Sequence, residues 1–168
     1  MTDGSKVPAY YKELTDKYPN QRTIELALVA DNSMVNLSFK LTDLRYLKEL
    51  YVAYERNVSL IDQRLKDISG WTNKFFLPLN IEVKLVASHI WSAYDLIPIT
   101  SDDADGTMDE LRKYQEKSFR VQHPNDILFL VTSVELTAAS MVENGTLMDG
   151  ESFLGQMCTP AYSAGFIV

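Results

Sequence analysis

An almost unbroken apolar run, Ile127 to Val134, constrains the fold of this chain more than any other segment. A strand with apolar residues on both faces needs cover on both faces, so this run predicts a central strand. Thr23–Ala30 has the same character, with Glu25 as the one exception. Both segments are typical of strands in a sheet that is covered by helices.

Between these segments the apolar residues follow helical spacing. From Thr42 to Phe76 they recur every three or four positions opposite a charged face, which predicts one long amphipathic helix. The predicted apolar stripe consists of Leu44, Leu47, Tyr51, Tyr54, Val58, Ile61, Leu65, Ile68 and Phe75. Residues 81–91 alternate instead and predict a strand. One face of that strand carries Ile81, Val83, Leu85 and Ala87.

The second half of the chain adds a helix and two short strands. Thr107 and Glu110 fit a capping box, which predicts that a helix of about three turns begins there. Short strands are predicted at 153–157 and 165–168, while residues 1–21 are expected to form an arm or linker. The order β-α-β-α-β-β-β predicts an α/β fold with a mostly parallel sheet and two main helices.

Composition limits the partners and the compartment. The formal net charge of −7 disfavours a nucleic-acid partner, because an acidic surface repels the phosphate backbone. No apolar run approaches the ~20 residues of a membrane span, and Met1–Leu14 shows no signal-peptide pattern. The lone Cys158 fits a buried thiol, whereas in a secreted protein it suggests a missing partner. Three sequons mildly support secretion and would place glycans on Asn36, Asn57 and Asn144.

The sequence contains no complete catalytic motif. There are two histidines, His89 and His123, and neither has a histidine four residues away, so no H-E-x-x-H zinc helix is present. Both are interpreted as surface or strand residues. Asp31–Val35 begins like a D-x-S-x-S metal loop, but Val35 replaces the second serine and cannot bind a cation, so that interpretation is rejected.

One pair of carboxylates is a candidate metal site. Glu25 stands near the start of the first predicted strand and Asp126 at the start of the central one. If these strands are parallel neighbours, both carboxylates lie at one end of the sheet, where they would repel each other. A hard cation such as Ca²⁺ would relieve that repulsion. From spacing alone, two exposed and unrelated acids remain the favoured interpretation.

Several stretches match one set of motifs in order. Thr23–Asp31 is similar to I-E-L-V-V-V-A-D, and Pro78–Ser92 is similar to P-L-N-I-x-V-x-L-V…I-W-S. His123–Thr132 is similar to H-D-N-A-Q-L-L-T, and Gly155–Gly165 to G-x-M-C-x-P…S-x-G. From about residue 21 to the end, the chain therefore resembles the reprolysin-type zinc metalloproteases, the family of ADAM, ADAMTS and snake-venom metalloproteases. No cysteine lies between Leu136 and Phe153, which disfavours the ADAMTS branch.

This resemblance implies a mixed sheet with one antiparallel edge strand, roughly residues 150–157, against which a peptide substrate lies. The residues implied in substrate binding are Gly150, Phe153, Leu154 and Gly155. Glu25 and Asp126 are similar to two side-chain ligands of the family's structural calcium. Cys158 matches a cysteine whose disulfide partner lies farther along the family's chain.

The family's catalysis uses H-E-x-x-H-x-x-G-x-x-H, which binds zinc and begins shortly after the S-x-G strand. Here the sequence stops at Val168, within a predicted core strand. The resemblance therefore implies that residues 22–168 are the N-terminal portion of a secreted zinc metalloendopeptidase's catalytic domain. That portion would act on protein or peptide substrates only within the parent and be inactive alone. The alternatives are a short non-catalytic decoy of the same fold and an unrelated α/β binding domain. Oligomeric state is not indicated.

Overall fold

The computed structural model describes residues 9–35, 58–137, 147–148, 150–152, 159 and 162–168. Its centre is a five-stranded sheet in the order β2-β1-β3-β7-β6. The strands are β1 (Arg22–Ala30), β2 (Ile81–Ile90), β3 (Ile127–Val131), β6 (Gly150–Ser152) and β7 (Ala164–Ile167). Only β6 runs antiparallel to its neighbour. The predicted α/β fold, mostly parallel with an antiparallel edge, is confirmed.

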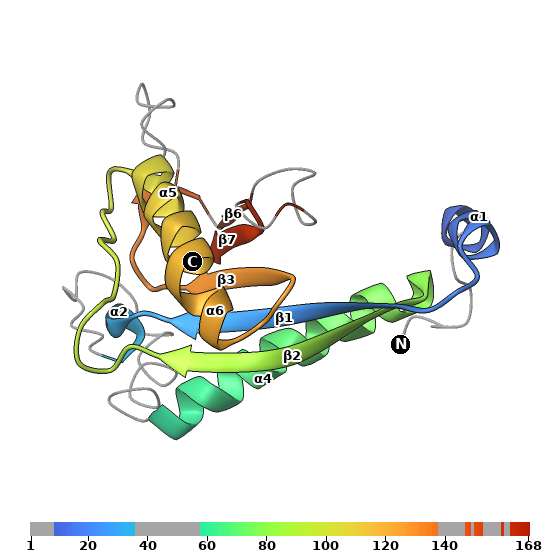
Figure 1. Cartoon of the computed structure of the whole chain (residues 1–168), viewed down its shortest axis with the longest axis horizontal. Helices are drawn as coiled ribbons and strands as arrows, with labels where there is room; N and C mark the ends of the chain where they lie inside the picture. The colour runs from blue at the N-terminus through green and yellow to red at the C-terminus, as the bar shows by residue number, and fades with distance from the viewer. Residues whose placement is uncertain (1–8, 36–57, 138–146, 149, 153–158, 160–161) are drawn as a thin grey trace, which may run out of the picture.

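Helices cover the sheet on both faces (Figure 1). Helix α4 (Val58–Phe76) packs on one face, and α5 (Ala104–Tyr114) packs on the other. Helix α5 continues through the π-helical turn η2 (Gln115–Phe119) into α6 (Arg120–Gln122). Because side chains alternate along a strand, β1 and β3 supply both apolar cores, as predicted for strands that are apolar on both faces.

The predicted stripe of α4 is largely correct. Ile61 and Leu65 are fully buried against the sheet, and Ile68 and Phe76 pack at the edge of the same core. Val58, the first residue of α4, and Phe75 are exposed instead. At the end of the helix, Phe76 takes the place that was predicted for Phe75 in the core. The predicted residues Leu44, Leu47, Tyr51 and Tyr54 lie outside the described residues.

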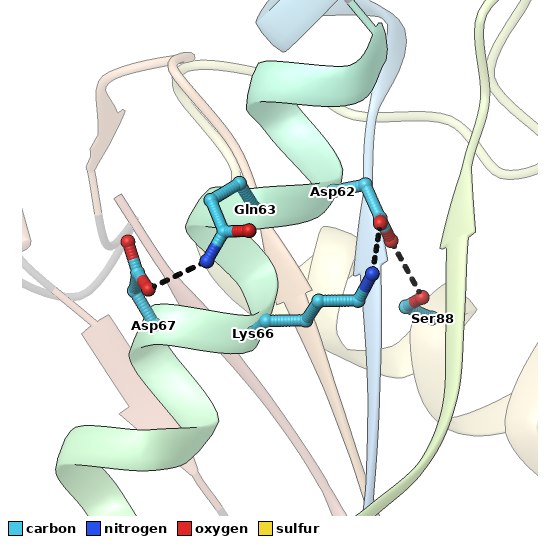
Figure 2. Close-up of polar contacts among 5 residues, drawn as sticks. All are labelled: Asp62, Gln63, Lys66, Asp67 and Ser88. Carbon is cyan, nitrogen blue, oxygen red and sulfur yellow. Dashed lines mark hydrogen bonds and ion pairs between the residues drawn. The ribbon is translucent and has the colours of Figure 1, made fainter.

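A polar contact attaches the outer side of α4 to β2 (Figure 2). The Ser88 hydroxyl donates to Asp62 Oδ1 at 3.1 Å, and Lys66 pairs with Asp62 Oδ2 at 2.5 Å. The hydrogen bond from Lys66 lowers the pKa of Asp62. One residue along the helix from the Asp62–Lys66 pair, Gln63 donates to Asp67 at 3.0 Å. Of these contacts, the hydrogen bond from Ser88 to Asp62 joins α4 to β2, and the other two lie within the helix.

Strand β2 changes phase in its middle. Leu85 pairs with Leu26 and Ala87 pairs with Ala27, so Val86 is an extra residue on β2. Before this irregularity Val83 and Leu85 face the α4 core, and after it Ala87 packs against the α5 core. The prediction that Ala87 shares a face with Val83 is therefore wrong, because a one-residue insertion reverses the alternation.

One further prediction needs correction, and the structure adds a helix to the predicted arm. Helix α5 begins at Ala104, with Asp103 as its N-cap accepting a hydrogen bond from the Gly106 N–H at 2.8 Å. Thr107 is buried and accepts a hydrogen bond from the Thr100 N–H, so it is not the cap. The predicted arm also contains the helix α1 (Ala9–Lys17).

Five short elements complete the described structure. Helix α1 contacts the 3₁₀ turn η1 (Leu77–Leu79), at the amino end of β2. Helix α2 (Asn32–Val35) follows β1 directly. A separate two-stranded ribbon pairs β4 (Leu136–Thr137) with β5 (Leu147–Met148).

Candidate functional site

The carboxyl ends of β1 and β3 are joined by the buried carboxylate of Asp31, which directly follows β1. Its Oδ1 accepts hydrogen bonds from the Ser33 hydroxyl at 2.5 Å and the Met34 N–H at 3.2 Å. Its Oδ2 accepts one from the Thr132 hydroxyl at 2.5 Å, just beyond the neighbouring strand. Three donors therefore compensate a carboxylate that is fully removed from solvent.

The same network extends into the loop after β3. Ser133 donates to the Ser33 hydroxyl oxygen from its N–H at 3.0 Å and from its own hydroxyl at 2.8 Å. Burial raises the pKa of Asp31, and the hydrogen bonds from Ser33 and Thr132 oppose that rise. We refer to Asp31, Ser33, Thr132 and Ser133 as the Asp31 clasp. Because both carboxylate oxygens already accept hydrogen bonds, the clasp joins the carboxyl ends of two strands.

The sequence pattern alone does not reveal the Asp31 clasp. Asp31 resembles the start of a metal loop, and Thr132 lies inside an apolar run. The usable signal is position, since both residues directly follow neighbouring parallel strands, whose carboxyl ends meet at one edge of the sheet.

The opposite end of the sheet brings the two predicted calcium ligands together. The Asp126 carboxylate accepts a hydrogen bond from the Glu25 N–H at 2.8 Å, and the Asp126 N–H donates to the Glu25 carbonyl at 2.8 Å. Both residues are exposed, and Lys84 stands opposite Glu25 in the register of β1 and β2. The two acids thus share one end of the sheet, and a calcium ion at this place stays a prediction.

Beside this end lies a buried polar network that connects the helical layer to β7. The fully buried Gln115 amide donates to Asn125 Oδ1 at 2.7 Å and to the Ser163 carbonyl at 3.5 Å. Arg120 Nη2 donates to the Asp126 carbonyl at 3.0 Å and to the Ser163 hydroxyl at 2.6 Å. These bonds hold the amino end of β3 against the start of β7.

The two histidines meet on the α5 side of the sheet. The ring centroids of His89 and His123 lie 4.4 Å apart, and both rings contact Phe119 at centroid distances of 5.2 and 5.1 Å. Burial lowers the pKa of His89, and charge on His123 lowers it further. His89 is a strand residue, as expected, but its contact with His123 is not visible in the sequence.

The antiparallel edge strand β6 is short, and its outer edge has no paired strand within the described residues. At Gly150 a Cβ atom would lie 2.8 Å from the Phe166 carbonyl oxygen, so this position requires glycine for the close approach to β7. Other predicted positions lie outside the described residues, namely Phe153, Leu154, Gly155, Cys158, Asn36, Asn57 and Asn144.

An open apolar groove of about 240 Å³ lies between α4 and the sheet. Thr72 and Phe76 of α4 line one side, and Phe129 and Ile167 line the sheet side. Ser152 at the edge strand is one of its few polar lining residues. The groove therefore offers apolar contact area but little hydrogen-bonding chemistry.

The described residues do not form a metal centre. No group of three or more histidine, cysteine, aspartate or glutamate side chains lies close enough together there to hold an ion. His89 and His123 touch each other, but a two-histidine contact does not fit the three-histidine zinc site that the resemblance implies. None of the described helices has the length and apolar character that a bilayer crossing requires.

The sheet order, the antiparallel edge and the ordered sequence motifs agree with comparisons to known proteins. A family profile described as "Reprolysin (M12B) family zinc metalloprotease" matches residues 46–168. The chain belongs to the reprolysin family. The resemblance stated from the sequence motifs is thereby confirmed, and the match covers α4, β2, α5, β3, β6 and β7.

Two curated relatives are considerably longer than this reprolysin-family chain. It is 27% identical over 161 residues to "Disintegrin and metalloproteinase domain-containing protein adm-2" of Caenorhabditis elegans, covering 96% of this chain and 14% of that protein. It is 26% identical over 152 residues to "Zinc metalloproteinase-disintegrin-like" of Cerberus rynchops, covering 90% of this chain and 21% of that protein. The chain spans about a fifth or less of their length.

A solved structure supports the fold alone. The chain aligns with part of a structure titled "Structure of a chaperone-substrate complex", with a TM-score of 0.56 and 12% identity. The alignment covers 88% of this chain and 20% of that one. At such low identity the similarity concerns the arrangement of strands and helices and not the function.

Proposed function

We propose that residues 22–168 form the N-terminal part of the catalytic domain of a secreted zinc metalloendopeptidase that hydrolyses peptide bonds in proteins. The observation that carries this proposal is the family match over residues 46–168, which includes the antiparallel edge of the sheet. In this proposal residues 1–21 precede the domain as an arm that contains α1.

The substrate side of the proposed function rests on β6. An extended peptide can add to the exposed edge of a sheet, where main-chain hydrogen bonds give affinity and alternate side chains give specificity. The proposed contacts are made by Gly150, Phe153, Leu154 and Gly155. The described part of this strand is antiparallel to β7 and lies at the edge of the sheet, as such binding requires.

The chemistry of such an enzyme comes from zinc, which activates a bound water and polarises the substrate carbonyl. The described residues do not form a zinc site, so we assign no catalytic step to them. Their proposed contribution is the sheet scaffold and the substrate-binding edge. The chain by itself is therefore proposed to be inactive.

Several accompanying features belong to the same proposal. Secretion would allow glycans at the three sequons and would allow Cys158 to form a disulfide with a residue farther along the parent chain. A structural calcium ion at Glu25 and Asp126 is supported by their common position at the amino end of the sheet. Thiol titration of the parent protein tests Cys158, and a free thiol there would count against the disulfide.

The main test compares the chain with a longer protein that carries it. The pure 168-residue chain should not cleave a generic fluorogenic peptide, with or without added zinc. The longer protein should cleave it in a chelator-sensitive manner. Chelator-sensitive cleavage by the chain alone would contradict its proposed inactivity. Absence of such cleavage by the longer protein would contradict the proposed enzyme.

A second candidate function is a non-catalytic decoy that binds peptides or proteins with the same fold. It is favoured by one observation, the absence of H-E-x-x-H from a sequence with two histidines. Reading the transcript beyond the codon for Val168 separates the two functions. A following H-E-x-x-H segment supports the enzyme, and a stop codon supports the decoy.

A further inference from the structure

Glu151 occupies the middle of the edge strand β6, between Gly150 and Ser152. It stands opposite Phe166 of β7, so both side chains lie on the face of the sheet that α5 covers. Glu151 is half-buried, and its Oε2 is shielded from solvent and has no hydrogen-bond partner among the residues that the structure describes. A carboxylate oxygen in that setting lacks the compensation that a buried charge requires.

Arg112, a cation of the helical layer, contacts other residues, although its buried Nε has no hydrogen-bond partner within the described residues. Arg112 of α5 pairs with Asp109 at 3.5 Å, and its guanidinium lies over the Tyr162 ring at 5.1 Å from the centroid. Within the part of the chain that the structure describes, no lysine or arginine forms an ion pair with Glu151. Within the described residues, Glu151 therefore lacks a positively charged partner.

We propose that Glu151 selects a basic side chain in a peptide that pairs with the free edge of β6. This inference rests on the proposed function, in which that edge receives the substrate. A peptide residue opposite Glu151 would point to the same face of the sheet, because directly opposed residues in paired strands share a face. A lysine or arginine at that place would supply the donor that Oε2 lacks.

The charge of the whole chain favours the same ligand class. With a formal net charge of −7, the domain attracts basic peptides and repels acidic ones before contact is made. This long-range attraction acts on every basic peptide and weakens with salt. Selection by Glu151 is local, so it depends on the position of the basic residue within the peptide.

The test measures binding of labelled heptapeptides to the intact chain by fluorescence anisotropy. The peptides are identical apart from lysine, norleucine or glutamate at the central position, and a second lysine peptide carries the charge one residue away. A favourable cross-strand charge pair predicts about two- to five-fold tighter binding of the central-lysine peptide than of the norleucine peptide. A one-residue shift moves the lysine to the other face and should reduce that preference.

Two variants separate local selection from overall charge. Glu151→Gln should abolish the preference for central lysine, while norleucine binding stays unchanged. Glu110→Gln removes the same charge from an exposed position on α5 and should leave the preference intact. Urea unfolding of each variant establishes that it is folded before its affinities are compared.

Several outcomes would overturn the inference. If Glu151→Gln keeps the preference for lysine, the selection comes from overall charge. If that variant aggregates while its peptide preference is unchanged, Glu151 protects the edge strand from self-association. If peptides bind without any preference, selection by Glu151 is wrong, but the proposal that β6 binds the substrate is retained. If no peptide binds at all, both selection by Glu151 and the proposed binding of substrate at β6 are contradicted.

Discussion

The two ends of the parallel sheet hold carboxylates in opposite settings. At the carboxyl end, Asp31 is fully buried and accepts hydrogen bonds from Ser33, Met34 and Thr132. At the amino end, Glu25 and Asp126 are exposed and touch each other through their backbones and one carboxylate oxygen. A buried carboxylate whose two oxygens both accept hydrogen bonds is a structural link, whereas exposed acids keep oxygens available for a ligand.

This difference predicts where the fold is sensitive and where it is permissive. Substitution at the carboxyl end removes a partner from several buried donors at once, and buried donors without partners are unfavourable. Substitution of the exposed acids at the amino end does not leave a buried polar group without a hydrogen-bond partner. Stability should therefore depend on Asp31, and cation binding on Glu25 and Asp126.

The largest expected effect is at Asp31. Replacement of Asp31 by Ala should lower the free energy of unfolding by about 2–4 kcal/mol, because two hydroxyls and one N–H lose their acceptor. Glu25→Gln at the other end is the matched control and should change it by less than about 0.5 kcal/mol. Urea unfolding followed by circular dichroism measures both. Equal losses of stability for the two variants would contradict the proposed difference between the two ends of the sheet.

The next effect concerns Arg120, which adds hydrogen bonds to the Asp126 carbonyl and the Ser163 hydroxyl at the amino end of the sheet. Arg120→Met should cost about 1–2 kcal/mol, since the Asp126 carbonyl and the buried Ser163 hydroxyl both lose a charged donor. Lys113→Met removes an exposed ion pair with Glu110 and should cost less than about 1 kcal/mol. The same unfolding assay compares them, and a larger loss for Lys113→Met would contradict the role of Arg120.

A third effect is the pH dependence that Asp31 imparts. Its pKa is raised in the folded state, so the folded protein binds a proton more readily than the unfolded chain, whose ordinary value is 3.8. The resulting stabilisation is fully present below 3.8 and is lost as the pH rises through the raised pKa. The stability difference between the natural protein and Asp31→Asn should therefore grow in favour of the natural protein as pH falls from 7. A difference independent of pH would show that Asp31 does not titrate differently in the two states.

The smallest expected effect is the response of the chain to calcium. At millimolar Ca²⁺ the stabilisation should stay below about 1 kcal/mol, because two carboxylates provide few ligands. Glu25→Gln and Asp126→Asn should each reduce it further, while Glu82→Gln on β2 should not. Thermal unfolding with Mg²⁺ at equal ionic strength controls for screening. A response that both variants retain would place any calcium elsewhere.

Much of the fold follows from periodicity. The apolar runs at 23–30 and 127–134 predict β1 and β3, which are neighbours at the centre of the sheet. The three- and four-residue spacing predicts α4 through Ile61 and Leu65. These signals are strong because burial acts on the whole face of an element, so a single residue seldom alters the pattern.

The departures arise where one residue decides the outcome. The start of α5 depends on the cap at Asp103, which competes with an equally plausible motif at Thr107. The phase change at Val86 depends on pairing with β1, which local sequence does not encode. The helix α1 lies in a polar segment whose composition is also typical of a linker.

The candidate sites were accessible to sequence reasoning only in part. Placing Glu25 and Asp126 together requires that both stand near the starts of parallel strands, which the sequence indicates. The contact of Gln115 with Ser163 joins residues 48 positions apart. The role proposed for Glu151 depends on the position of β6 at the edge of the sheet. Such contacts depend on the assembled sheet, so no local pattern predicts them.

The extra residue in β2 also affects how sequences of this kind should be aligned. Because Val86 shifts the strand by one position, Ser88 reaches Asp62 on α4, while His89 reaches His123 on the opposite layer. A homologue that lacks one residue here would need a gap at this point, and its residues after the gap would exchange layers relative to an ungapped alignment. An inserted or deleted codon in this strand would therefore reassign four positions, Ala87 to Ile90, in a single evolutionary step.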